Sequence, residues 1–186
     1  MKSMFLLAAG ALFSLASLPT AACSDLLAAK FRTLAGKDSS SLCEQFEGQV
    51  LLVVNTASKC GFTPQYEGLE ALHQRLKGRG FSVLGFPSND FMGQEPGTEK
   101  EIQEFCTLTY GVKFPMFEKL SVKGEAADPF YRALTEATGQ EPGWNFHKYL
   151  IDRSGKAVAS FGSRVKPDDA EMLRQIEELL EVDSGA

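Results

Sequence analysis

The chain has 186 residues, of which 44% are hydrophobic, and a formal net charge of −5 at pH 7. That length suits a single domain with its own hydrophobic core. The acidic balance, without any basic stretch interleaved with aromatic residues, excludes a nucleic-acid-binding protein.

Residues 1–22 have the pattern of a secretory signal peptide. Lys2 is followed by an apolar run and then by small residues up to Ala22, and the run is too short and too weakly flanked for a stable membrane span. A buried N-terminal helix is the alternative, but no polar residue interrupts the run to make an amphipathic face. We therefore expect cleavage before Cys23, one domain at residues 23–186, and an exported, periplasmic protein. A cysteine at the new N-terminus also allows a lipoprotein, tethered to a membrane through a lipidated Cys23.

The next segments predict a strand, a helix and a second strand. QVLLVVN has the Val and Leu content of a strand buried on both faces. TPQYEGLEALHQRLKGRG has Thr63 as an N-cap, Pro64 at the first helical position and leucines at helical spacing, and it ends at Gly78 or Gly80. FSVLGF is again a buried strand, so the two strands are expected to be parallel.

The rest of the chain predicts two helices, a hairpin and a last helix. Thr98 and Glu101 form a Thr-x-x-Glu capping box, and Asp128 with Pro129 opens a short helix through PFYRALTEATG. FHKYLI and AVASF, separated by DRSGK, predict a β-hairpin. PDDAEMLRQIEELL has acidic residues in its first turn and apolar residues on one face, as expected of a final helix.

This order of elements predicts an α/β domain with a thioredoxin-like fold, in which helices flank a central mixed sheet of about four main strands. Sites in such sheets lie in the crevice at the carboxyl ends of the strands. Cys60, in NTASKCGFTP, lies just beyond the end of the first predicted strand.

The position of Cys60 favours a reactive thiol. Near a helix N-terminus, unpaired N–H groups and the helix dipole favour the thiolate, which is the nucleophilic form. The alternative is a small core residue, because free cysteine is among the most buried residue types. Cys60 follows the polar segment TASK and precedes Gly61, outside the apolar run, and this placement argues against the core.

Two other kinds of site fit the sequence poorly. There is no C-x-x-C motif, so simple disulfide exchange lacks its second thiol. His73 and His147 are the only histidines and no cysteine pair has ligand spacing, so we expect no metal and take both histidines as surface or packing residues. A lone thiolate can still attack the O–O bond of a peroxide and form a sulfenic acid, provided that donors stabilise the departing oxygen.

Four blocks carry a resemblance to a known family. NTASKCGFTPQYEGLEAL, GFPSNDFMGQEPGT, FPMF and WNFHKYLI, in this order and spacing, resemble the glutathione peroxidase family over residues 27–181. The resemblance implies a cofactor-free enzyme that reduces hydrogen peroxide and organic or lipid hydroperoxides, with Cys60 as the peroxidatic residue. It also implies that Gln94, Trp144 and Asn145 complete the catalytic group. Their amide and indole N–H groups are neutral donors that can stabilise a thiolate and a developing oxyanion.

The same resemblance assigns Cys106, in EFCTLTYGVKFPMF, as the resolving cysteine of the thioredoxin-dependent branch. A buried helical cysteine is the alternative. A disulfide needs Cα atoms about 4.4 to 6.8 Å apart, so the helix would have to open locally for Cys106 to reach Cys60. Many relatives have FPCNQF where this chain has FPSNDF, so Ser88 removes a competing thiol and Asp90 adds a carboxylate of unknown effect.

Several properties stay open at the level of sequence. Cys43 has no family role, and with Cys23 it either forms an incidental disulfide or stays free. Only TGQEPG precedes the WNF block, where tetrameric relatives carry an insertion, so a monomer open to bulky lipid hydroperoxides is expected. The favoured reductant is thioredoxin or a thioredoxin-like protein. The alternatives are glutathione with a structural Cys106, and a peroxide-sensing module that does not turn over.

Overall fold

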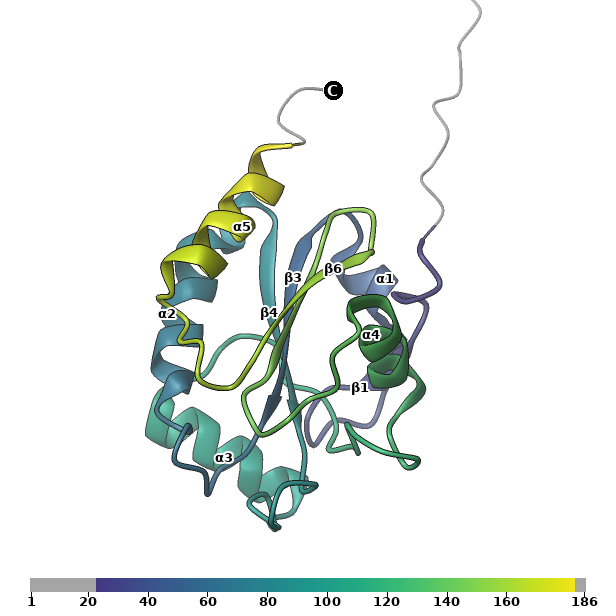
Figure 1. Cartoon of the computed structure of the whole chain (residues 1–186). Helices are drawn as coiled ribbons and strands as arrows, with labels where there is room; N and C mark the ends of the chain where they lie inside the picture. Colours follow the sequence, from purple (N-terminus) through teal and green to yellow (C-terminus); the bar gives the residue numbers. More distant parts are fainter. Residues whose placement is uncertain (1–22, 183–186) are drawn as a thin grey trace, which may run out of the picture.

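The computed structural model describes residues 23–182, so the predicted signal peptide at residues 1–22 lies outside the described residues (Figure 1). The centre of the domain is a four-stranded sheet with the strand order β4-β3-β5-β6. The strands are β3 (Val50–Thr56), β4 (Phe81–Pro87), β5 (Lys148–Ile151) and β6 (Ala157–Phe161). β3 pairs with β4 in parallel and with β5 antiparallel, and β5 and β6 form the expected hairpin. The mixed four-stranded sheet is therefore confirmed.

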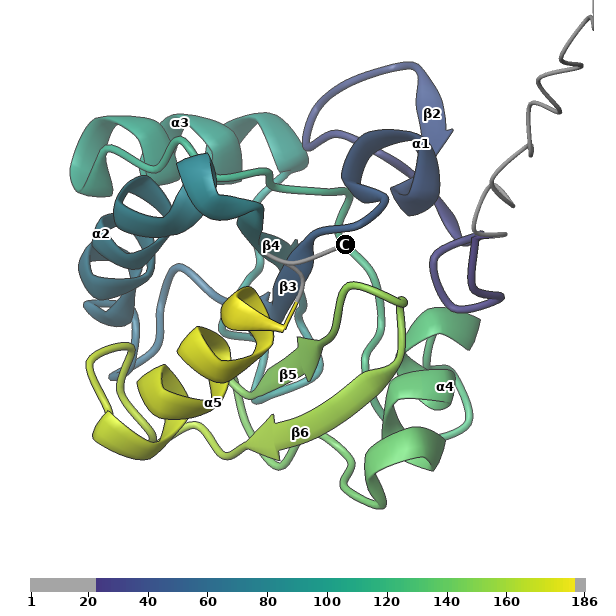
Figure 2. The same ribbon diagram turned by 90° about the horizontal axis from the view of Figure 1, so that it is seen from above.

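Helices cover both faces of this sheet (Figures 1 and 2). One face carries α2 (Gln65–Leu76), α3 (Glu99–Tyr110) and α5 (Ala170–Glu181), and the other carries α1 (Leu42–Phe46) and α4 (Pro129–Thr138). The buried side chains divide in the same way into two core clusters, one under each set of helices. We call them the α2 core and the α4 core.

The two parallel strands supply the middle of both cores. Every residue of β3 and of β4 is buried. Along β3, Val50, Leu52 and Val54 face the α2 core, while Leu51 and Val53 face the α4 core. This alternation on a strand buried on both sides is why the run in the sequence is continuously apolar.

Most helix ends agree with their sequence signals. Thr98 and Glu101 form the reciprocal capping box at the start of α3, and Gly111 ends that helix with φ of 62°. Asp128 caps α4 through the N–H of Phe130, and α4 ends at Thr138 before a left-handed glycine. A short 3₁₀ turn, η1 (Lys77–Arg79), extends α2 to a glycine in the same conformation.

The N-terminal part of the domain contains elements that the sequence did not predict. β1 (Lys30–Arg32) and β2 (Ser39–Ser41) form a small antiparallel sheet, followed directly by the one-turn helix α1. Phe31 of β1 packs edge-on against Phe86 and Phe130, so this segment closes the α4 core. Among residues 23–182, no helix is long and apolar enough to cross a bilayer.

Candidate functional site

Cys60 lies in the turn between β3 and α2, at the carboxyl end of β3. The hydroxyl of Thr63 accepts a hydrogen bond from the Cys60 N–H at 3.0 Å and donates to the Ala57 carbonyl at 2.9 Å. The prediction of Thr63 as the N-cap was therefore wrong. The Thr63 hydroxyl instead shapes the cysteine turn, and Pro64, predicted at the first helical position, occupies the N-cap position, where its side chain has no acceptor to cap the helix.

The sulfur of Cys60 has one hydrogen-bond donor within the described chain. The Phe62 N–H lies 3.4 Å from Cys60 Sγ, and Cys60 itself is 9% exposed. Backbone N–H groups at the start of a helix stabilise negative charge on a cysteine sulfur. The residue is more buried than its polar surroundings in the sequence suggested, and it belongs to the α2 core.

Gln94 and Asn145 come together beside this turn. The Asn145 side-chain N–H donates to Gln94 Oε1 at 2.9 Å, and the Lys59 backbone N–H donates to the Gln94 carbonyl at 3.0 Å. Asn145 is fully buried and Gln94 is half-buried. The structure thus links both predicted amides to each other and to the residue before Cys60, while the Gln94 amide N–H groups stay available as donors.

Trp144 is held in place by Asn55, a residue that the sequence analysis missed. The fully buried side chain of Asn55 donates to the Trp144 carbonyl at 3.1 Å and accepts from the His147 N–H at 3.1 Å. Between Trp144 and His147 in the chain, Phe146 has a φ of 64°. A residue other than glycine adopts this left-handed conformation only when its surroundings impose it. The Trp144 ring is partly buried, lies 5.5 Å from that of Phe91, and packs against both cores.

Cys106 lies in the second half of α3 and points into the α2 core, the cluster that also contains Cys60. It is 2% exposed. Burial raises the pKa of the Cys106 thiol to about 11, although the nearby Tyr66 hydroxyl opposes part of that shift. At neutral pH Cys106 is therefore a protonated thiol, and in this conformation Cys60 and Cys106 are both free.

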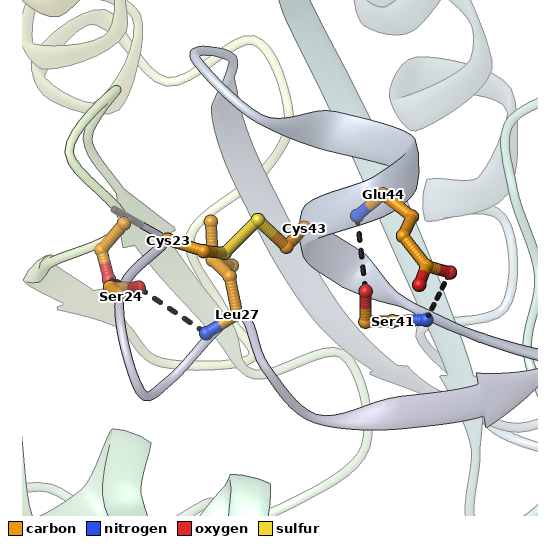
Figure 3. Close-up of a disulfide and its surroundings, with 7 residues drawn as sticks. Cys23, Ser24, Leu27, Ser41, Cys43 and Glu44 are labelled. Atoms are coloured by element: carbon orange, nitrogen blue, oxygen red, sulfur yellow. Dashed lines mark hydrogen bonds between the residues drawn. A yellow bond between two sulfur atoms is a disulfide. The ribbon is translucent and has the colours of Figure 1, made fainter. Parts of the chain in front are cut away.

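The other two cysteines are joined to each other. Figure 3 shows the disulfide between Cys23 and Cys43, whose Cα atoms are 6.0 Å apart. It connects the first described residue to helix α1, whose start is fixed by the capping box of Ser41 and Glu44. Of the two outcomes left open by the sequence, the structure shows the paired one.

Comparison with known proteins identifies the family. The glutathione peroxidase sequence profile matches residues 28–135. The chain is 52% identical over 145 residues to a hydroperoxy fatty acid reductase of Synechocystis, covering 73% of this chain and 85% of that protein. It is also 48% identical over 148 residues to a glutathione peroxidase-like peroxiredoxin of Schizosaccharomyces pombe, covering 76% and 94%. The chain belongs to the glutathione peroxidase family.

Solved structures agree with this assignment. The apo form of Trgpx superposes with a TM-score of 0.68 at 33% identity, over 86% of this chain and 98% of that chain. A thioredoxin-family thiol:disulfide interchange protein of Chlorobium tepidum, at 18% identity, superposes with a TM-score of 0.60 over 81% and 92%, which confirms the thioredoxin-like fold. The protein is accordingly a peroxidase, a thiol peroxidase or hydroperoxide reductase of the glutathione peroxidase type.

Within this family, the residues that depart from the commonest motif have structural explanations. Ser88 is fully buried directly after β4, and its hydroxyl accepts a hydrogen bond from the Asp90 N–H at 3.4 Å. The Asp90 carboxylate accepts from Ser121 Oγ at 2.9 Å and from the Val122 N–H at 2.6 Å. Asp90 therefore fixes the loop before α4, a role that the sequence did not indicate.

The two histidines are packing residues. His73 is 7% exposed and accepts a hydrogen bond from the Val83 N–H, while His147 is 4% exposed and bonds Ser160 through Nε2. Burial lowers the pKa of His147 to about 4, with a further lowering by the neighbouring Lys148, and burial also lowers the pKa of His73. Within residues 23–182, no group of three His, Cys, Asp or Glu side chains could hold a metal ion.

Proposed function

We propose that this protein is a two-cysteine peroxidase in which Cys60 attacks the peroxide and Cys106 resolves the product. The observation that carries the proposal is the division of the four cysteines. Cys23 and Cys43 are closed in a disulfide, which leaves Cys60 and Cys106 as the two free thiols, both in the α2 core.

In the first step, the Cys60 thiolate attacks the terminal oxygen of the hydroperoxide. The O–O bond breaks, Cys60 becomes a sulfenic acid, and the departing alkoxide or hydroxide takes up a proton to leave as an alcohol or as water. Gln94, Trp144 and Asn145 are proposed as the donors around this step. The amide pair of Gln94 and Asn145 and the anchoring of Trp144 by Asn55 support this role, since donors that are already fixed stabilise developing charge best.

In the second step, the Cys106 sulfur attacks the Cys60 sulfenic acid, forming a disulfide and releasing water. Helix α3 must open for this, and the burial pattern supports local opening. Ile102 and Cys106 are its only buried residues, whereas α2 buries five. A helix with few buried apolar contacts opens at low cost. Faster amide hydrogen exchange over residues 100–110 after oxidation is expected, and a formed disulfide with unchanged exchange would contradict the opening.

The reductant is proposed to be thioredoxin or a thioredoxin-like protein, because an intramolecular disulfide is the form that a dithiol reduces. A reduction by glutathione, with Cys106 as a structural residue, is the second candidate. While helix α3 is closed, the deep burial of Cys106 and its raised pKa favour a structural role for this cysteine, and therefore glutathione as the reductant. A variant without Cys106 separates the two.

We further propose that the protein is exported and acts as a monomer. The disulfide between Cys23 and Cys43 supports export, because such bonds persist in oxidising compartments. It argues against a lipid anchor, since the sulfur of Cys23 cannot carry a lipid and a disulfide together. The short connection between α4 and Trp144 supports the monomer.

The test is steady-state reduction of hydrogen peroxide and of an organic hydroperoxide, with thioredoxin and its reductase beside glutathione and its reductase. Wild type is compared with Cys106→Ser and, as a matched control, with Cys43→Ser. We expect wild type to turn over with thioredoxin. The Cys106→Ser variant should lose this turnover, and the Cys43→Ser variant should keep it. Preference for glutathione with an active Cys106→Ser would overturn the resolving role, and no turnover by wild type would favour the sensing module.

A further inference from the structure

A carboxylate of α2 binds the chain that follows the helix of Cys106. Glu70, in the middle of α2, accepts hydrogen bonds at Oε2 from the backbone N–H groups of Lys113 and Phe114, at 2.8 and 3.1 Å. Its other oxygen, Oε1, accepts from Gln74 Nε2 at 2.7 Å, so α2 itself orients the carboxylate. Helices α2 and α3 are neighbours on one face of the sheet (Figure 2). Glu70 therefore joins α2 to the segment directly after α3.

This segment is connected to Cys106 through the end of α3. The Cys106 carbonyl accepts a hydrogen bond from the Val112 N–H at 3.1 Å, and Lys113 and Phe114 follow Val112 in the chain. Unwinding the end of α3 breaks the Val112 bond. The freed chain can then swing away from α2 only after Lys113 and Phe114 have left Glu70.

The chain on either side of this part is fixed to other elements. In the first turn of α3, the Arg32 guanidinium binds both carboxylate oxygens of Glu99, at 3.1 and 3.2 Å. Beyond the segment held by Glu70, the Pro115 carbonyl accepts a hydrogen bond from the Gly85 N–H of β4 at 2.9 Å. The part of the chain that can open therefore lies between these two anchors, and it includes Cys106.

Within this part, Glu70 supplies the hydrogen bonds that oppose opening. Among residues 104–114 of the described chain, Lys113 and Phe114 are the only residues whose backbone N–H groups bind another element. The remaining hold on this end of α3 is apolar, with the Tyr110 ring 5.5 Å from that of Tyr66. Hydrogen bonds to a charged acceptor are stronger than neutral ones, and Glu70 is half-buried, so water competes only partly for its oxygens.

We propose that Glu70 is a positioning residue for the resolution step, because its carboxylate keeps α3 closed and limits how often Cys106 reaches the Cys60 sulfenic acid. The inference rests on the proposed two-cysteine cycle and names the residue that regulates its second step. In the open state the S–S bond forms, the S–O bond of the sulfenic acid breaks, and the hydroxide leaves with the thiol proton as water. Glu70 binds neither sulfur, so the attack of Cys60 on the peroxide does not depend on it.

The first test follows the two steps separately after addition of one equivalent of hydrogen peroxide to the reduced protein. Trapping with dimedone measures the Cys60 sulfenic acid, and mass spectrometry without reduction measures its disulfide with Cys106. Glu70→Ala should form the disulfide about tenfold faster, the scale of one lost hydrogen bond to a charged acceptor, while the sulfenic acid forms at the wild-type rate. Glu70→Gln, whose amide oxygen accepts without a charge, should lie between. Glu136→Ala, which removes an exposed glutamate of α4, is the matched control and should behave as wild type.

A second measurement needs no peroxide. In the reduced protein, alkylation of the buried Cys106 by iodoacetamide reports the opening of α3, and it should be about tenfold faster in Glu70→Ala. The Lys113 and Phe114 amides should also exchange faster, whereas the Lys119 N–H, which binds Glu99, should keep its rate.

Two results would separate the possible failures. Unchanged or slower disulfide formation in Glu70→Ala would overturn the proposal, because a residue with a purely structural role does not accelerate one step and spare the other. Faster alkylation of Cys106 in a protein that forms no disulfide between Cys60 and Cys106 would overturn the two-cysteine cycle and leave Glu70 only the closure of α3.

Discussion

Replacing Asn55 by alanine should both destabilise the protein and slow its turnover. The Asn55 side chain satisfies two backbone groups of another segment, the carbonyl of Trp144 and the N–H of His147, each at 3.1 Å. The substitution would leave the Trp144 carbonyl and the His147 N–H without these hydrogen-bond partners. An unsatisfied buried polar group costs about 1–3 kcal/mol, so the substitution should lower the free energy of unfolding by about 3 kcal/mol.

The expected effect on activity follows from the same contacts. With the Asn55 side chain removed, the segment of Trp144 and Asn145 keeps only the backbone bonds between residue 55 and residues 146 and 147. Misplacement of these groups by a fraction of an ångström then reduces stabilisation of the leaving oxygen. Urea unfolding gives the free energy, and steady-state peroxide reduction at 25 °C gives the rate.

Val53→Ala is the matched control for the Asn55 variant. Val53 is fully buried on the same strand but faces the α4 core, so its truncation should cost a similar free energy and leave the rate of the folded protein unchanged. A loss under about 1 kcal/mol for Asn55→Ala, together with wild-type turnover, would refute the anchoring role.

Three further outcomes are expected from the structure. Loss of the bond between Cys23 and Cys43, which are 20 residues apart, should lower the free energy of unfolding by about 3 kcal/mol without affecting turnover, as measured by urea unfolding of Cys43→Ser. His147 has a folded pKa of about 4, below its unfolded value, so the unfolded chain binds a proton first as pH falls. Stability should then decline between about pH 6.5 and pH 4, by about 3 kcal/mol at most, and His147→Gln should flatten this slope. Gly85→Ala should lower the melting temperature, because the added Cβ would overlap the Met116 sulfur where residues 114–117 run against β4.

The sequence correctly predicted those helices and strands for which the local residue pattern and the packing in the fold favour the same conformation. The apolar runs of β3 and β4 are continuous because both strands are buried on two faces. The Thr98 and Glu101 pair and the Asp128 cap act within one helical turn, so their geometry follows from spacing alone. Here sequence pattern and tertiary structure impose the same conformation.

Other features depend on partners that are distant in the sequence. Asn55 is the polar end of an apolar run, and its partner Trp144 is 89 residues away. Thr63 has the spacing of an N-cap, but its hydroxyl satisfies the cysteine turn, where the competing hydrogen bonds are better placed. The sequence left open whether Cys23 and Cys43 form a bond or stay free, because connectivity is not encoded in spacing.

The arrangement of the four cysteines keeps the disulfide apart from the two free thiols. Cys23 and Cys43 pack against the α4 core, whereas Cys60 and Cys106 belong to the α2 core on the opposite face of the sheet. Thiol–disulfide exchange requires direct attack of one sulfur on another. Because the strand layer lies between the two pairs, opening of α3 can expose Cys106 to Cys60 without bringing either one to the structural disulfide. In the proposed cycle, Cys60 and Cys106 can thus be oxidised and reduced repeatedly while the other pair stays closed.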